Sequence, residues 1–392
     1  MAYNYFPLSA SQVARRKTAW NGLSQKKPFG RPAIVYSNIL DWGQLEKEIQ
    51  PADQIPLTGP TGKNPAWDKH IRAELRNMQI SAASRFQDDR FPHLSMPRHI
   101  HGESQGLAEI FGCKLLPQNE EGTFFYPIPS IEFAADVDRL KLAPLDDCLY
   151  LKAVEYAQYA IESTDGQLSI ANPVMTGPVD TANYILGSMR LMEWVYDEPK
   201  ALHKLLQMIT DVLITIIQRL QKATGNRLRP DSSFCMDTGY GLCSETRDLL
   251  SMEAVKEYES YYLRQIGEAC GPYMFHGCGS WERTLPDVIA DPNLMAINFQ
   301  SKEMDLEKVR DHIDGKVSLS IGLSTGLDER YIWPDEASFI KHLVSVFPQP
   351  VPMELHLSFE GCMALKTEAS TNPWFNPFKK TGGRFFYLTR YV

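Results

Sequence analysis

The segment YMFHGCGS, residues 273–280, places a histidine and a cysteine two positions apart. In a strand, residues i and i+2 project to the same side, so His276 and Cys278 can both point at one ion. Gly277 and Gly279 allow the backbone to turn there, because glycine has no Cβ. Imidazole and thiolate are ligands that zinc prefers. The spacing therefore indicates a zinc site, although a hydrogen-bonded core histidine and a packed cysteine would give the same pattern.

A third zinc ligand is expected from Cys362, in the stretch FEGCMAL. It follows the strand-like run MELHLSF. In a closed barrel of parallel strands, this run and the run before His276 end on the same face, where active sites are found. Two thiolates and one neutral imidazole balance the charge of Zn²⁺, which lowers the cost of burying the ion. Three protein ligands would leave the fourth position to substrate.

Two further stretches carry polar side chains on strand-like runs. Asp237, in CMDTGYG, is expected at a strand end, where it would contact substrate, act as a fourth zinc ligand or cap a loop. Tyr240 is a further candidate for substrate contact. In MELHLSFEG, Glu354, His356 and Ser358 share one strand face. In a barrel this face would fill the interior as a hydrogen-bonded layer.

These residues need a fold that brings the ends of distant strands together. From about residue 165, short β-prone runs alternate with longer helical ones, which predicts parallel strands joined by crossover helices. PAIVYSNI and TFFYPIPSIEF supply two more strands and complete a single TIM-type (β/α)8 barrel of the α/β class. The rival is an open doubly wound sheet, but no glycine-rich phosphate loop opens an early helix. The six strands of the alternating region are LSIANPV (168–174), SSFCMDT (232–238), PYMFHGC, NLMAINFQ, KVSLSIGL and MELHLSF.

The first part of the chain is irregular, with proline-rich and polar stretches such as EIQPADQIPLTGPTGKNPAWDKH. We expect residues 1–120 to form an N-terminal extension or lid together with the first barrel elements. Residues 121–392 would then complete the TIM-type barrel, and the whole chain would be one structural domain.

Composition narrows the class of protein. The formal net charge of -8 argues against a general nucleic-acid binder, which usually presents a basic face. No window approaches the roughly 18 uninterrupted apolar residues that span a bilayer, and the N-terminus lacks the pattern of a signal peptide. The seven cysteines are odd in number and dispersed, unlike a disulfide framework. A soluble cytoplasmic protein without nucleic-acid or membrane partners is expected.

The chain resembles the uroporphyrinogen decarboxylase superfamily, and within it the zinc-dependent, corrinoid-linked methyltransferases. The likeness covers roughly residues 80–365. It is carried by TGPVDTANYILGSMRLMEWVYDEPKALHKLLQMITD, by CMDTGYGLCSETRDLLSMEAVKEYESYYLRQI and by FHGCGSWERTLPDVIA with the NFQSKEMDLEKVRDHIDGKVSLSIGL that follows. Its most specific element is H-x-C with a distant C-terminal cysteine, which His276, Cys278 and Cys362 match one by one.

The resemblance implies a TIM-type barrel, a zinc ion, and cobalamin on a separate corrinoid protein, because this chain has no D-x-H-x-x-G motif to mark a corrinoid domain. It implies methyl transfer between that cobalt and a small methylated compound or a thiol. Tyr184 matches a family tyrosine that points into the cavity, with core packing as the other interpretation. Asp88 and Asp89, followed by His93, match an acidic pair near the pocket, with a solvated loop as the alternative.

One departure from the family bears on substrate. Uroporphyrinogen decarboxylases carry an arginine-rich N-terminal segment that binds porphyrinogen carboxylates, whereas RPAIVYSNILDWG contains only Arg31. The alternative functions are a metal-free lyase on a different carboxylate, using Tyr184 and the Asp88/Asp89 pair, and a non-catalytic binding protein with a structural zinc. The sequence leaves open the methyl donor, the direction of transfer, the fourth zinc ligand at rest, and whether the chain forms a homodimer.

Overall fold

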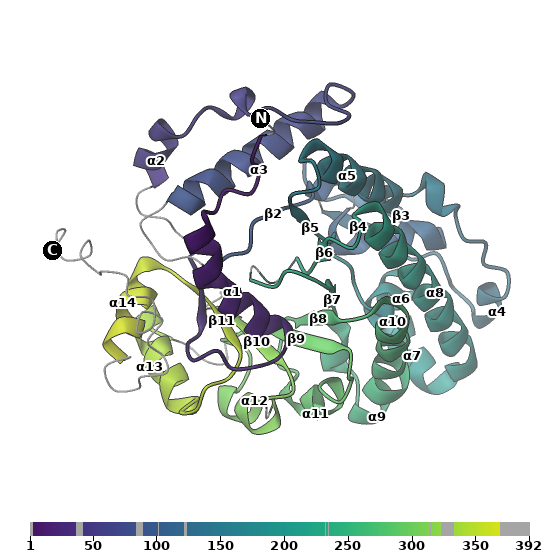
Figure 1. The fold of residues 1–392 in the computed structure, drawn as a ribbon. Coiled ribbons are helices and arrows are strands. Elements are labelled where there is room, and N and C mark those ends of the chain that lie inside the picture. Colours follow the sequence, from purple (N-terminus) through teal and green to yellow (C-terminus); the bar gives the residue numbers. More distant parts are fainter. Residues whose placement is uncertain are drawn as a thin grey trace.

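Parallel strands form the centre of the molecule, and helices surround them (Figure 1). The computed structural model describes residues 3–36, 42–83, 89–100, 102–120, 124–231, 233, 235–313, 315–322 and 333–368. One sheet has six strands in the order β1-β11-β10-β9-β8-β7, and a second has three in the order β2-β5-β6. All neighbours in both sheets are parallel. The strands are β1 (Ala33–Tyr36), β2 (His93–Leu94), β5 (Ser169–Ala171), β6 (Leu228–Arg229), β7 (Tyr240–Cys243), β8 (Tyr273–Gly277), β9 (Leu294–Gln300), β10 (Ser318–Gly322) and β11 (Met353–Leu357).

Hydrogen bonds outside the ladders join the two sheets at both edges. The amide of Asp89, just before β2, donates to the carbonyl of Ile34 in β1 (2.8 Å). At the other edge, the amide of Cys243 in β7 donates to Met175, and the amide of Gly177 donates back to Cys243 (2.9 and 2.7 Å). β6 pairs with β5 itself, and β7 pairs with the chain that follows β5, at residues 175–177. The two short strands therefore occupy one strand position in the barrel. Parallel strands with helices outside are the architecture of a TIM-type barrel.

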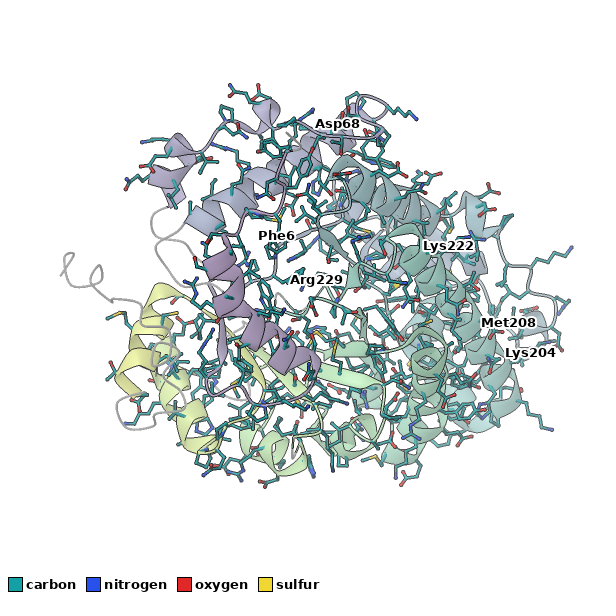
Figure 2. The ribbon with its side chains drawn as sticks, viewed as in Figure 1. Phe6, Asp68, Lys204, Met208, Lys222 and Arg229 are labelled. Atoms are coloured by element: carbon teal, nitrogen blue, oxygen red, sulfur yellow. The ribbon has the colours of Figure 1, made fainter. Side chains whose placement is uncertain are left out.

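The outer helices bury apolar faces toward the interior of the molecule. α8 (Pro199–Ala223) starts with a proline, whose missing N–H costs nothing at this position. Its buried residues recur at spacings of three and four, as an amphipathic helix requires, and Lys204 lies on its outer side (Figure 2). α8 is long and apolar enough to cross a membrane by length and composition alone, but 50% of its apolar window is buried in the fold. The other helices outside the strands are α3 (Pro65–Ala83), α5 (Leu149–Ser163), α6 (Pro178–Leu186), α7 (Ser188–Asp197), α10 (Tyr261–Cys270), α12 (Leu306–Ile313) and α13 (Glu336–Val346).

Two segments predicted as barrel strands do not form barrel strands. TFFYPIPSIEF forms β4 (Phe125–Ile128), which pairs antiparallel with β3 (Lys114–Pro117) in a separate hairpin. The run at 232–238 is not a strand in its described part, and β7 begins only at Tyr240. Gly239, with φ +101°, turns the chain immediately before β7. The two-residue strand β2 is a barrel strand, lying between β1 and β5. It is too short to leave a periodic signal in the sequence.

The N-terminal region contacts the amino ends of the strands. α1 (Ala10–Ser24) ends where Ser318, the first residue of β10, donates its hydroxyl to the carbonyl of Leu23 (2.7 Å). Lys26 then donates to the carbonyl of Leu294, the first residue of β9 (3.0 Å). This helix therefore lies at the end of the barrel opposite to the carboxyl ends of the strands.

A second irregular segment borders the carboxyl ends. It follows β2 and includes the 3-10 helix η3 (Glu103–Phe111). Thr176, in the chain after β5, donates its hydroxyl to the carbonyl of Ser104 (3.3 Å). The first 120 residues thus contribute to both ends of the barrel, and a lid function for them stays a prediction.

Candidate metal centre

His276 and Cys278 lie at the carboxyl end of β8 and point at one another. The Nε2 atom of His276 is 3.5 Å from the Sγ atom of Cys278. Both residues are half-buried, with 24% of the His276 side chain exposed. Solvent therefore reaches the pair, and the predicted convergence of the two side chains is confirmed.

The turn that carries Cys278 requires both of its glycines. Trp281 donates its indole N–H to the carbonyl of Gly277 (3.1 Å). A Cβ at Gly277 would lie 2.8 Å from that indole nitrogen. Gly279 has φ +81°, and a Cβ there would overlap the carboxylate of Asp248. The glycines thus serve close approach as well as turning.

Asn298 in β9 fixes the orientation of the His276 ring. The amide nitrogen of Asn298 donates to the carbonyl of Ser320 (2.9 Å), so its Oδ1 atom must accept. His276 Nδ1 lies 2.6 Å from that Oδ1 and therefore carries the proton. The Nε2 atom is left with a lone pair, directed toward Cys278. This arrangement is common behind metal-binding histidines.

The sulfur of Cys278 accepts a hydrogen bond from the side-chain amide of Gln300 (Nε2 to Sγ, 3.0 Å). Burial raises the pKa of Cys278 to about 12, and the charge of Glu245 adds to this effect while Gln300 opposes it. Without an ion, the thiol is protonated at neutral pH. A bound metal ion would displace that proton, since metals bind the thiolate.

Glu245 is the third group of the cluster, and sequence reasoning missed it. The structure brings together one ligand atom from each of Glu245, His276 and Cys278, and these three atoms lie within 4.8 Å of one another. The carboxylate also accepts from the amide of Cys278 (2.8 Å). Burial, together with the charge of the nearby Asp180, raises the pKa of Glu245 to about 7. The available signal was its place two residues after β7, the strand beside β8.

Cys362 lies on the same side of the barrel but outside that cluster. It is buried in α14 (Phe359–Glu368), which follows the carboxyl end of β11. Among the parts of the chain that the structure describes, the group within 4.8 Å contains Glu245 and not Cys362. The role of Cys362 as a zinc ligand stays a prediction.

Two predicted tyrosines have different surroundings. Tyr184, on α6, is half-buried, and its hydroxyl lies 3.5 Å from the hydroxyl of Ser104 at the carboxyl ends of the strands. Burial, with a contribution from Asp180, raises the pKa of Tyr184. Tyr240 is fully buried at the start of β7 and stacks on Tyr273 (5.9 Å between ring centroids). Tyr240 thus packs in the core, whereas Tyr184 borders the open end.

The remaining predicted residues lie away from the metal centre. Asp237 accepts a hydrogen bond from Ser24 (3.0 Å), at the end of the barrel where α1 packs. Asp89 is buried and pairs with Arg31, and Asp88 lies outside the described residues. His93 Nδ1 lies 2.7 Å from the carbonyl of Phe91, and burial together with the charge of Arg229 lowers the His93 pKa well below its ordinary value. Substrate contacts by these residues stay predictions.

The predicted hydrogen-bonded layer inside the barrel is confirmed for Glu354 and His356, whereas Ser358 follows β11 and its amide donates to Glu336 of α13 (2.9 Å). Glu354 is fully buried and accepts from the hydroxyl of Ser233 (2.7 Å) and from the amide of Cys235 (3.0 Å). His356 Nε2 lies 2.6 Å from its other oxygen. Arg229 lies in the middle of the ring of strands (Figure 2). Its charge and that of Glu354 offset one another in the interior.

Replacing Asn298 with alanine is expected to weaken zinc binding by about 10- to 100-fold, because His276 would lose the bond that holds its tautomer and ring orientation. Competition with a chromophoric chelator measures this affinity. Asn293→Ala, at the amino end of β9, is the matched control and should bind zinc like the unaltered protein. Equal affinity in both variants would show that Asn298 does not orient the ring.

Together these features define a TIM-type barrel with a histidine, a cysteine and a glutamate at the carboxyl ends of two adjacent strands. The profile of the uroporphyrinogen decarboxylase (URO-D) family matches residues 105–320, and the chain belongs to this family. A solved structure of a methyltransferase from Methanosarcina mazei is similar, with a TM-score of 0.58, 13% sequence identity, and coverage of 91% of this chain and 98% of that chain. At this identity the likeness concerns the fold. No curated protein sequence matches the chain.

Proposed function

We propose that the chain is a cytoplasmic zinc-dependent methyltransferase. It would move a methyl group between the cobalt of a separate corrinoid protein and either a thiol or a small methylated compound, such as a methyl ether or amine. The observation that carries this proposal is the pair of His276 Nε2 and Cys278 Sγ, 3.5 Å apart and open to solvent. Membership of the URO-D family and the similar fold of a methyltransferase support it.

The side chains present fit a zinc ion. Nitrogen, sulfur and carboxylate oxygen are all zinc ligands, and catalytic sites use three of them with one position left open. When bound, zinc would supply Lewis-acid chemistry that stabilises a substrate thiolate or improves the leaving group of a methyl donor. Asn298 would hold the imidazole, and Gln300 would donate to the sulfur.

Two residues compete for the third position. Either Glu245 or Cys362, joined to His276 and Cys278, gives two anionic ligands and one neutral one, so both sets balance the charge of Zn²⁺. The contact between Glu245 and His276 (Oε1 to Nε2, 3.8 Å) favours the glutamate at rest. Cys362 remains the ligand that the family resemblance implies.

The metal-free lyase is less well supported. Acting on a carboxylate substrate requires cationic groups that are free to bind it. Arg31, the arginine of the N-terminal segment, instead makes two bonds to Asp89 (2.5 and 2.7 Å). Around Cys278, Glu245 and Glu303 add negative charge. These charges suit a cation better than an anionic substrate.

The proposal is tested with cobalt(I) cobalamin. Zinc-loaded protein is incubated with it and with a panel of methyl ethers, amines and thioethers, and methyl-cobalt formation is followed optically. The reverse reaction is tested with methylcobalamin and a thiol. About one zinc per chain and methyl transfer in either direction support the proposal. Activity of a metal-free protein as a lyase would overturn it.

The third ligand is identified by a pair of variants. If Glu245 binds the ion, Glu245→Gln should lower zinc affinity by more than the ~10- to 100-fold expected for a residue outside the ligand set. Cys362→Ser should then leave affinity nearly unchanged. The opposite pattern assigns the position to Cys362. Cobalt(II) substitution provides an independent measurement, because the charge-transfer absorption from sulfur doubles when two thiolates bind.

A further inference from the structure

β11 carries a second histidine whose surroundings are those of a chemically active imidazole. His356 Nε2 lies 2.6 Å from Glu354 Oε1 and 3.2 Å from the hydroxyl of Ser320. The His356 side chain is 21% exposed, whereas that of Glu354 is 0% exposed. A buried carboxylate thus holds a histidine that solvent can reach. None of the proposed zinc ligands takes part in this pair.

The Glu354 carboxylate is fixed as an acceptor. Its Oε2 atom already accepts from the hydroxyl of Ser233 and from the amide of Cys235 (2.7 and 3.0 Å). His356 Nε2 must therefore carry the proton that it shares with Oε1. The basic position of a neutral ring is then Nδ1, on the edge away from Glu354. The same arrangement, a buried carboxylate behind a histidine, orients general bases in hydrolases.

The strand register places this pair beside the metal centre. His276 is level with Asn298, Asn298 with Ser320, and Ser320 with Glu354. Hydrogen bonds follow this line, from His276 to Asn298 and from Asn298 to the Ser320 hydroxyl (3.1 Å). All of these side chains therefore belong to the same inner face of the strands.

His356 also leans toward the metal centre. It is level with Gly322, which has no side chain, and a Cβ there would lie 3.1 Å from the Cβ of His356. The bond to Ser320 places the ring over β10, two strands from His276. Two strand spacings amount to about 10 Å, which a small substrate, or a leaving group with one water, can span.

We propose that His356, positioned by Glu354, exchanges a proton with the substrate during methyl transfer. The inference rests on the proposed function. In demethylation of an ether, the carbon–oxygen bond breaks and the electron pair of cobalt(I) forms the new bond to the methyl carbon. The oxygen leaves with the pair of the broken bond and takes the proton from imidazolium His356. Solvent then reprotonates the ring.

The test uses His356→Ala in the zinc-loaded protein, with whichever methyl donor the unaltered protein accepts. General acid catalysis predicts a rate lowered by about 10²- to 10⁴-fold at unchanged zinc content. Added imidazole should restore part of the rate, because it can occupy the space left by the ring. An unchanged rate, or a loss that imidazole does not restore, overturns the proposal. His342→Ala, on α13, is the control and should keep full activity.

Glu354→Gln separates positioning from folding. It should also lower the rate of methyl transfer, and added imidazole should not restore that rate. Ser233→Ala removes one hydrogen bond to Glu354 and serves as the comparison for folding. Zinc content and the unfolding midpoint in urea should be close in the two variants. A rate equal to that of the unaltered protein overturns the positioning role of Glu354.

A second measurement does not depend on methyl transfer. Diethyl pyrocarbonate modifies imidazole nitrogens that are basic and accessible, and mass spectrometry locates the modified residues. His356 should be modified alongside the exposed His99. If no donor reacts even with the unaltered protein, the proposed function fails, and the proton exchange fails with it. Modification of His356 would then still show that its imidazole is basic and accessible, as the inference requires. An unmodified His356 where His99 is fully modified overturns it.

Discussion

Replacing Cys278 with serine is expected to abolish stable zinc binding and, with it, methyl transfer. The sulfur is the thiolate donor of the cluster of Glu245, His276 and Cys278, and the serine hydroxyl does not ionise at neutral pH. Its loss must exceed the ~10- to 100-fold effect of a residue that only supports a ligand. Zinc content after dialysis, measured by mass spectrometry, should fall from about one per chain to nearly zero. His276→Ala should give the same result.

The control for this prediction is a cysteine that lies outside the centre. Cys270, at the end of α10, is buried, and its sulfur contacts the carbonyl of Ile214 (3.8 Å). Cys270→Ser should keep its zinc and its activity. If Cys278→Ser also kept its zinc, the ion would be bound elsewhere and the proposed centre would be wrong.

Asp89→Asn is expected to lower the free energy of unfolding by about 3–5 kcal/mol at pH 7, because it leaves the charge of Arg31 buried without a partner. The two side chains are 4% and 12% exposed and make two bonds. Asp89 also accepts from the amide of Ile34 in β1 (2.9 Å). The pair thus joins β1 to the chain before β2, at one edge where the two sheets meet. Urea denaturation measures the difference.

The effect should depend on pH with a definite sign. Burial favours a higher pKa for Asp89, but the charge and hydrogen bonds of Arg31 outweigh it, and the folded-state pKa is lowered. The stabilisation is therefore complete above the unfolded pKa, about 3.9, and is lost as the pH falls through the folded value. The difference between the two proteins should shrink below about pH 4.

The exposed pair of Asp136 and Arg139 provides the control, with side chains 32% and 74% exposed. Asp136→Asn should change stability by less than about 1 kcal/mol. A similar small change for Asp89→Asn would contradict the structural role of the buried pair.

Much of the barrel could be predicted because its strands are long enough to show their character. β8 and β9 are largely apolar runs, which is typical of parallel strands covered on both sides, and β10 and β11 alternate apolar with polar residues. A helical stretch follows each of these strands. β2 has two residues, too few for any periodicity. β4 is apolar as well, but pairing with β3 depends on a neighbour in space that composition does not reveal.

Only part of the metal centre could be predicted from the sequence, namely the two residues that lie on one strand. His276 and Cys278 are two positions apart, so the geometry of one strand suffices to bring them together. Glu245 joins them through register, since Cys243 in β7 is level with His276 in β8. The spacing of residues along the chain does not reveal which residues of two neighbouring strands lie level with one another. Asp237 illustrates the reverse case, because its stretch looked like a strand end and instead meets α1.

The bond between Asn298 and His276 has a consequence for how the proposed zinc ion would be bound. The imidazole is already turned, with its lone pair facing the cysteine, before any cation arrives. Loading then requires the release of a thiol proton but no swing of the ring. If the protein binds zinc as proposed, it would take up the ion directly from a pool of exchangeable zinc, without passing through an unfolded or rearranged state.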